Sequence, residues 1–106
     1  MDDYQSFVVS TKRYDPQYAV LYPALGLASE AGEVAGKVKK VLRDAAGQLD
    51  IEQANKIIDE LGDVIWYVTC IVDDLGFSLE EVIERNRIKL SGRVERNTIQ
   101  GSGDER

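Results

Sequence analysis

Two pairs of acidic residues carry the strongest chemical signal in this chain. Glu30 and Glu33 lie three positions apart, and so do Glu60 and Asp63. In a helix this spacing puts both members of a pair on one face. Four carboxylates that face each other repel unless a cation lies between them, and Mg²⁺ is a hard ion that prefers oxygen ligands. We therefore expect a magnesium site between two helices, with a solvated acidic surface as the alternative.

Three glycines stand close to these acids in the sequence. Gly32, Gly36 and Gly62 fall within segments that otherwise have helical periodicity, and a glycine inside a helix costs about 1 kcal/mol relative to alanine. They indicate a close approach by another backbone, a ligand or a metal shell. Tight packing between helices is the ordinary alternative.

The last helical segment carries polar residues on its apolar face. Asn86, Lys89 and Arg93 lie at helical spacing on the side that Val82 occupies. Arginine binds phosphate through a planar fork and lysine binds it as a point charge. These two cations are therefore candidates for phosphate binding, unless both simply extend outward at the end of the helix.

Other cations follow the first acidic pair. Lys37 lies one turn after Glu33, a spacing that suits an ion pair within one helix. We expect Lys39, Lys40 and Arg43 on the solvated surface.

The elements that must position these groups are all helical. Apolar residues recur every three or four positions, and no alternating strand pattern of useful length appears. Asp50 with Gln53 and Ser78 with Glu81 have the spacing of capping boxes, and Gly76 suits a helix end. The prediction is one all-α domain, residues 1–106, resembling a four-helix bundle, with helices over 2–13, 24–46, 51–75 and 79–93 and a polar tail over about 94–106.

The third predicted helix is apolar nearly all the way round. Residues 64–72 read VIWYVTCIV, and a helix that is apolar on every side is buried on every side. Because four short helices cannot easily enclose one of their own number, we expect a homo-oligomer, a dimer or a tetramer. The alternative is that Trp66 and Cys70 pack beneath the first helix.

Composition excludes several classes of protein. The chain has no histidine, which removes the common zinc sites and Ser-His-Asp catalysis, and Cys70 is its one cysteine. A net charge of -6 argues against general nucleic-acid binding. No signal peptide or membrane-spanning stretch is evident, so we expect a cytoplasmic protein that binds neither nucleic acid nor membrane.

The segments around the acids resemble a known family. GLASEAGEVAGKVKK followed by DELGDVIWYV is similar to the MazG-like, all-α nucleotide pyrophosphohydrolases, in which an E-x-x-E pair precedes an E-x-x-D pair. The N-x-x-K-x-x-x-R pattern of Asn86, Lys89 and Arg93 is similar too. The ending GSGDER resembles a GDxR ending of short, often phage-type, members. The resemblance covers nearly the whole chain.

The resemblance implies a function and roles for particular residues. Glu30, Glu33, Glu60 and Asp63 would bind Mg²⁺, with Mn²⁺ as a possible substitute, while water attacks the α-phosphorus of a nucleoside triphosphate and releases pyrophosphate. The remaining implied contacts are with the substrate: Lys89 and Arg93 would hold the phosphates, and Tyr67 and Asn86 would lie against the base. Lys37 is a further candidate for substrate binding.

Two details depart from this pattern or stay open. Ser29 stands where some relatives carry an additional acid, so the number of metal ions is not determined. Either Glu30 or Glu33 would serve as the general base. The alternatives to an enzyme are a helical interaction protein and a sensor that binds metal or nucleotide without turnover.

Overall fold

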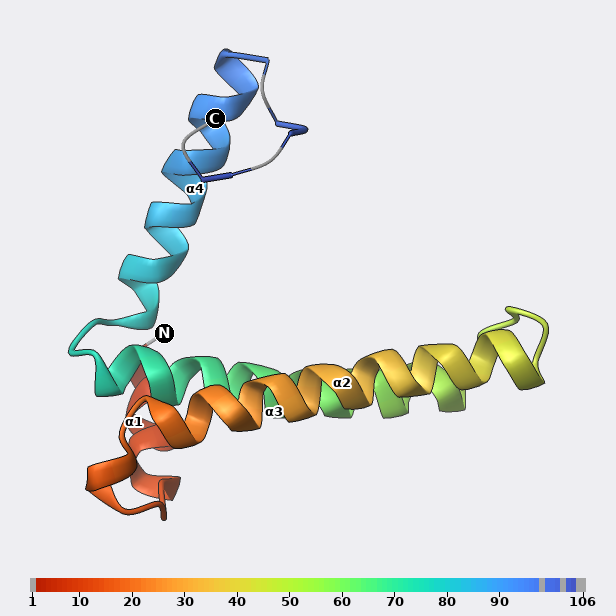
Figure 1. Ribbon diagram of the computed structural model, residues 1–106, viewed down its shortest axis with the longest axis horizontal. Helices are drawn as coiled ribbons and strands as arrows, with labels where there is room; N and C mark the ends of the chain where they lie inside the picture. The colour runs from red at the N-terminus through yellow and green to blue at the C-terminus, as the bar shows by residue number, and fades with distance from the viewer. Residues whose placement is uncertain (1, 98, 102, 105–106) are drawn as a thin grey trace.

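The chain folds into helices alone over the residues that the structure describes. This computed structural model describes residues 2–97, 99–101 and 103–104. Its elements, drawn in Figure 1, are α1 (Asp2–Thr11), the short 3₁₀ helix η1 (Pro16–Tyr18), α2 (Leu21–Asp44), α3 (Ile51–Asp74) and α4 (Leu79–Glu95). The predicted all-α class is confirmed. None of these helices combines the length and apolar character that a membrane span requires.

Local sequence signals account for several of the helix ends. Both predicted capping boxes form, at Asp50 with Gln53 and at Ser78 with Glu81. Gly76, with φ of 82°, follows α3 where the chain must turn. The second helix begins at Leu21, earlier than predicted, because proline is tolerated anywhere in a first turn, where backbone N–H groups have no partner within the helix.

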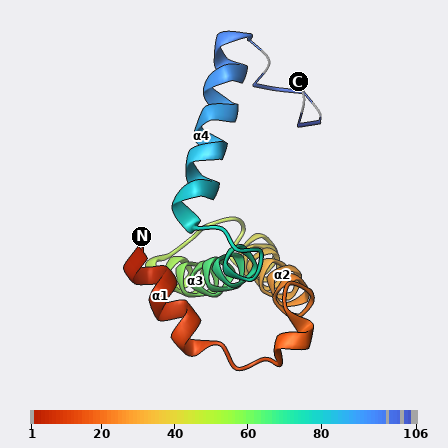
Figure 2. The same ribbon diagram turned by 90° about the vertical axis from the view of Figure 1, so that its left-hand side faces the viewer.

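The two long helices α2 and α3 form an antiparallel hairpin that is the main body of the molecule. Figure 1 shows them side by side along their length, and Figure 2 shows the same pair nearly end-on, with α1 across one end. Val8 of α1 and Cys70 of α3 are both fully buried at that end. The indole of Trp66 donates a hydrogen bond to Thr11 of α1 at 2.7 Å. Trp66 and Cys70 therefore do pack against the first helix.

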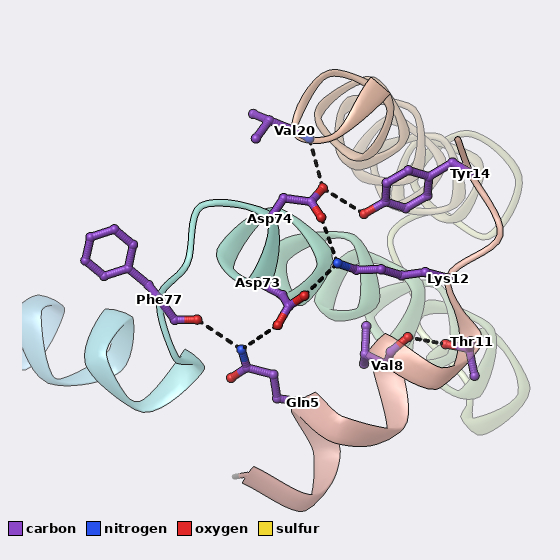
Figure 3. A network of polar contacts seen from close by, with 9 residues as sticks. All are labelled: Gln5, Val8, Thr11, Lys12, Tyr14, Val20, Asp73, Asp74 and Phe77. Atoms are coloured by element: carbon purple, nitrogen blue, oxygen red, sulfur yellow. Dashed lines mark hydrogen bonds and ion pairs between the residues drawn. The ribbon is translucent and has the colours of Figure 1, made fainter. Parts of the chain in front are cut away.

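Asp74, at the end of α3, joins three segments (Figure 3). Its carboxylate accepts hydrogen bonds from the Tyr14 hydroxyl at 2.8 Å and from the Val20 backbone N–H at 2.9 Å, and it pairs with the Lys12 ammonium at 2.7 Å. Val20 has φ of 68°, a conformation that costs a β-branched residue free energy. The bond to Asp74 holds this strained residue in place at the start of α2.

Helix α4 stands away from the other helices. Figures 1 and 2 both show it leaving the hairpin at a steep angle, so that one chain by itself does not close a four-helix bundle. Its side chains Ile83, Ile88 and Val94 are 41%, 64% and 65% exposed. A further apolar stripe runs along α3 through Ile58, Leu61 and Ile65, all exposed. Within residues 64–72, the segment that predicted an oligomer, only Ile65 is exposed, so most of that segment is covered within a single chain. The apolar surface left uncovered lies mainly on α4 and at Ile58 and Leu61 of α3.

Loss of the Asp74 carboxylate should destabilise the fold. Removing one partner of a buried ion pair leaves the other groups unsatisfied, so Asp74→Asn should lower the free energy of unfolding by about 3 kcal/mol, as measured by urea denaturation at pH 7. Asp59→Asn, at an exposed position of the same helix, should change it by less than about 0.5 kcal/mol.

The stabilisation by Asp74 should also depend on pH. Burial opposes ionisation of this carboxyl, but the bonds from Lys12, Val20 and Tyr14 outweigh it and hold its pKa below the ordinary 3.8. A lowered pKa in the folded state stabilises the protein above pH 3.8, and that contribution disappears as the pH falls below it. The stability difference between wild type and Asp74→Asn should therefore shrink at pH 3 and below; an undiminished difference there would contradict this explanation.

Candidate metal and nucleotide site

Three of the four predicted acids come together on the hairpin. Carboxylate oxygens of Glu30 from α2 and of Glu60 and Asp63 from α3 all lie within 4.8 Å of one another. Glu33 is exposed and lies outside this triad. The reason is rotational, since Glu33 lies about 60° farther round the helix than Glu30 from the apolar stripe at Leu27.

The electrostatics of this acidic triad favour a bound cation. Glu60, within hydrogen-bonding reach, raises the pKa of Glu30, and desolvation and the nearby charges add to the increase. Two ionised carboxylates are both acceptors, so this contact satisfies neither. Glu60 Oε2 is buried and has no hydrogen-bond partner within the described chain. A buried acceptor among converging carboxylates fits a hard, oxygen-ligated cation.

Lys37 does not make the ion pair expected from its spacing. Its ammonium lies 3.5 Å from Glu60 Oε1, across the interface between α2 and α3. The predicted partner was Glu33 on the same helix, but the register of the hairpin places Glu60 within reach instead. Lys37 therefore borders the acidic triad.

Aromatic side chains surround a cavity next to the triad. The cavity has a volume of about 290 Å³ and is lined by Thr11, Arg13, Tyr14, Tyr22, Trp66 and Tyr67. The rings of Tyr14 and Tyr22 stack with centroids 5.1 Å apart, and Trp66 meets Tyr67 edge-on at 5.0 Å. Burial raises the pKa of Tyr67, and the charges of Glu30 and Asp63 contribute to the same shift. Tyr67 therefore belongs to both the aromatic cavity and the edge of the acidic triad.

The position of Tyr67 depends on a glycine that sequence reasoning missed. A Cβ atom on Gly26 of α2 would collide with the ring of Tyr67, so the ring keeps this position only against glycine. The glycines that were expected to mark a close approach, Gly32, Gly36 and Gly62, have nothing within 4 Å of an added Cβ. Gly26 lies one turn before Glu30, just as Tyr67 lies one turn after Asp63, and this symmetry was the available signal.

The predicted phosphate ligands of α4 bind the C-terminal tail. Lys89 pairs with Asp104 at 3.3 Å, and Arg93 donates to the backbone oxygens of Gly103 at 3.3 Å and Asp104 at 3.1 Å. Asn86 lines a separate groove on α4. The structure does not bring these three residues to the acidic triad, because α4 leads away from the hairpin (Figure 1). Of the GSGDER ending, Ser102, Glu105 and Arg106 lie outside the described residues.

Comparisons with known proteins find one matching family model and two similar proteins. The model of the MazG nucleotide pyrophosphohydrolase domain matches residues 22–97. The Gene 37 protein of Mycobacterium phage L5 is 48% identical over 85 residues, which cover 80% of this chain and 75% of that protein. The Uncharacterized protein YvdC of Bacillus subtilis (strain 168) is 36% identical over 74 residues, covering 65% of this chain and 70% of that protein.

No solved structure matches the chain. The family match spans α2, α3 and α4, and it therefore includes the acidic triad, Tyr67 and the cations of the last helix. On this evidence the chain belongs to the MazG nucleotide pyrophosphohydrolase domain family.

Proposed function

We propose that this protein hydrolyses a nucleoside or deoxynucleoside triphosphate to the monophosphate and pyrophosphate, with Mg²⁺ as the cofactor and Mn²⁺ as a possible substitute. The observation that carries the proposal is the acidic triad of Glu30, Glu60 and Asp63 together with an aromatic cavity. Tyr67 links the two, since it lines the cavity and the charges of Glu30 and Asp63 act on its pKa. A cation site next to an aromatic surface suits a nucleotide, which has an anionic end and a flat base.

The acids would divide the chemical work between them. Glu30, Glu60 and Asp63 would hold the metal, which when bound supplies positive charge at the α-phosphate and favours ionisation of water. Glu33 is exposed beside the triad without belonging to it, so it is free to accept the proton of the attacking water. The oxygen of that water bonds to the α-phosphorus, the bond to the bridging oxygen breaks, and pyrophosphate leaves.

A second copy of the chain would complete the site. In one chain, Asn86, Lys89 and Arg93 lie on a helix that leads away from the acids, and that helix exposes apolar side chains. A cavity of about 390 Å³ that is almost wholly apolar is lined by Tyr4 of α1, Gly62 and Ile65 of α3, and Leu79 of α4. We infer that a dimer or tetramer covers these surfaces and brings α4 of one copy to the acids of another.

The metal proposal is tested by Glu60→Gln. Because it removes one ligand charge, turnover should fall by at least about 100-fold at saturating Mg²⁺. Mg²⁺ at a hundredfold excess over its Kd should stabilise the wild type by about 2.7 kcal/mol, a rise of roughly 10 °C in Tm. The variant should lose most of this gain, and it should melt higher than wild type in EDTA because one repelling charge is gone.

The control Glu52→Gln, exposed on the same helix, should respond to Mg²⁺ like wild type. An equal response in Glu60→Gln would show that the acids share no metal.

The role of the aromatic cavity is tested by Tyr67→Ala and Gly26→Ala. The first removes the ring and the second displaces it, so both should raise KM by about tenfold while lowering kcat much less, as expected for uniform binding of the base. Tyr18→Ala, an exposed aromatic outside the cavity, should leave KM unchanged. A normal KM in folded Gly26→Ala and Tyr67→Ala would exclude this cavity as the base site.

The composite site is tested by mixing two inactive variants. Glu60→Gln and Arg93→Gln disrupt different parts of the site, so a mixed dimer keeps one intact site if α4 acts on the partner copy. After joint refolding, activity should return to about a quarter of wild type, since about half of the dimers are mixed and each keeps one site of two. No recovery, or a monomer mass by light scattering, would contradict the composite site.

A further inference from the structure

A second cavity on the hairpin is lined by three lysines. It has a volume of about 250 Å³ and is formed by Lys37, Lys40 and Val41 of α2 with Gln53 and Lys56 of α3. Val41 is buried and forms an apolar floor, while Lys40 and Lys56 are exposed. Lys40 is exposed, as expected, and it lies with two other cations around a hollow.

This lysine cavity lies in line with the acidic triad and the aromatic cavity. On α3, the residues Gln53, Lys56, Glu60, Asp63 and Tyr67 follow one another by steps of three and four, which places them on one stripe of the helix. On α2, Gly26, Glu30, Lys37 and Lys40 form the matching stripe. The two stripes run in opposite chain directions because the helices are antiparallel. In space they therefore give the same order along the hairpin: aromatic cavity, acidic triad, lysine cavity.

Contacts confirm that the three parts are neighbours on one face. Lys37 belongs to the lysine cavity and pairs with Glu60 of the triad at 3.5 Å. Lys56 precedes Glu60 by one turn, which is about 6 Å along the helix axis. At the other end, the Tyr67 ring packs against Gly26. The charges of Glu30 and Asp63 contribute to the raised pKa of Tyr67, which places this ring near the triad.

The charges of the lysine cavity suit a small polyanion. The chain as a whole has a net charge of -6, so three ammonium groups around one hollow are a local reversal of sign that would concentrate anions there. Among the described residues, Lys56 has one ion pair, an exposed one with Glu52 at 3.4 Å, and such surface pairs contribute little to stability. Phosphate oxygens could therefore take the place of the Glu52 carboxylate beside Lys56 with little loss of free energy.

From this order of sites we propose that the lysine cavity binds the β- and γ-phosphates of the substrate and holds the pyrophosphate after cleavage. The assignment rests on the proposed function and gives the substrate a direction along the hairpin. The base lies in the aromatic cavity, the α-phosphate at the acidic triad, and the leaving group among Lys37, Lys40 and Lys56.

The test compares ligands that reach different parts of this row. Isothermal titration calorimetry in Mg²⁺ would measure the Kd of inorganic pyrophosphate and of each of the four common deoxynucleoside monophosphates. In the double variant Lys40→Gln with Lys56→Gln, the Kd of pyrophosphate should rise at least tenfold, while monophosphate binding stays at the wild-type value. The KM for the triphosphate should rise by a similar factor. The control Lys39→Gln, a cation of the same helix outside the cavity, should change none of these.

Each other result overturns the assignment. Unchanged pyrophosphate binding in the double variant would show that the lysines are not part of the site. Equal weakening of pyrophosphate and monophosphate binding would show only a general effect of net charge. A loss of pyrophosphate binding in Lys39→Gln as large as that in the double variant would show the same. The calorimetry does not depend on turnover. Suppose that the wild type hydrolyses no triphosphate but binds pyrophosphate, and that the double variant does not bind it. The hydrolase proposal then fails, and the anion site stands.

Discussion

The register between α2 and α3 is the constraint on which the rest of this molecule depends. It is set at one end by Asp74, whose carboxylate binds the Val20 N–H at the start of α2, and at the other by the short connection between the two helices. A shift by one residue would rotate each stripe by about 100°. The triad of Glu30, Glu60 and Asp63, the contact of Tyr67 with Gly26 and the pair of Lys37 with Glu60 would then all be lost together.

A single chain buries little apolar surface for its length. The fully enclosed side chains are few and small, chiefly Val8, Cys70 and Thr69 near the crossing of α1 and α3. Polar anchoring by Asp74 and Lys12 therefore contributes more to the position of α1 than it would in a larger core. The exposed apolar residues of α4 and α3 are the physical reason that we propose an oligomer. The surface that is exposed in one copy is also the surface that would complete the site in an oligomer.

Opposite charges are arranged along one face of the hairpin rather than mixed over it. Acids that repel each other are held together between an aromatic cavity on one side and a group of lysines on the other. Lys37 relieves part of the repulsion through Glu60, but Glu60 Oε2 has no hydrogen-bond partner among the described residues. This arrangement is costly for an empty site. On the function that we propose, it would favour a nucleotide with Mg²⁺, which combines a cation with a polyanion.

The sequence by itself determined the helical class, two of the helix caps and the four acids from which the triad is drawn. Periodicity and capping are local properties, so Asp50, Ser78 and the E-x-x-E and E-x-x-D spacings could be interpreted without a structure. Which residue faces which across the hairpin is not local. Only the tertiary structure decided that Lys37 meets Glu60, that Gly26 rather than Gly32 admits a ring, and that α4 leads away from the acids. Those outcomes depend on the register, and the register depends on contacts such as Asp74 with Val20, 54 positions apart in the chain.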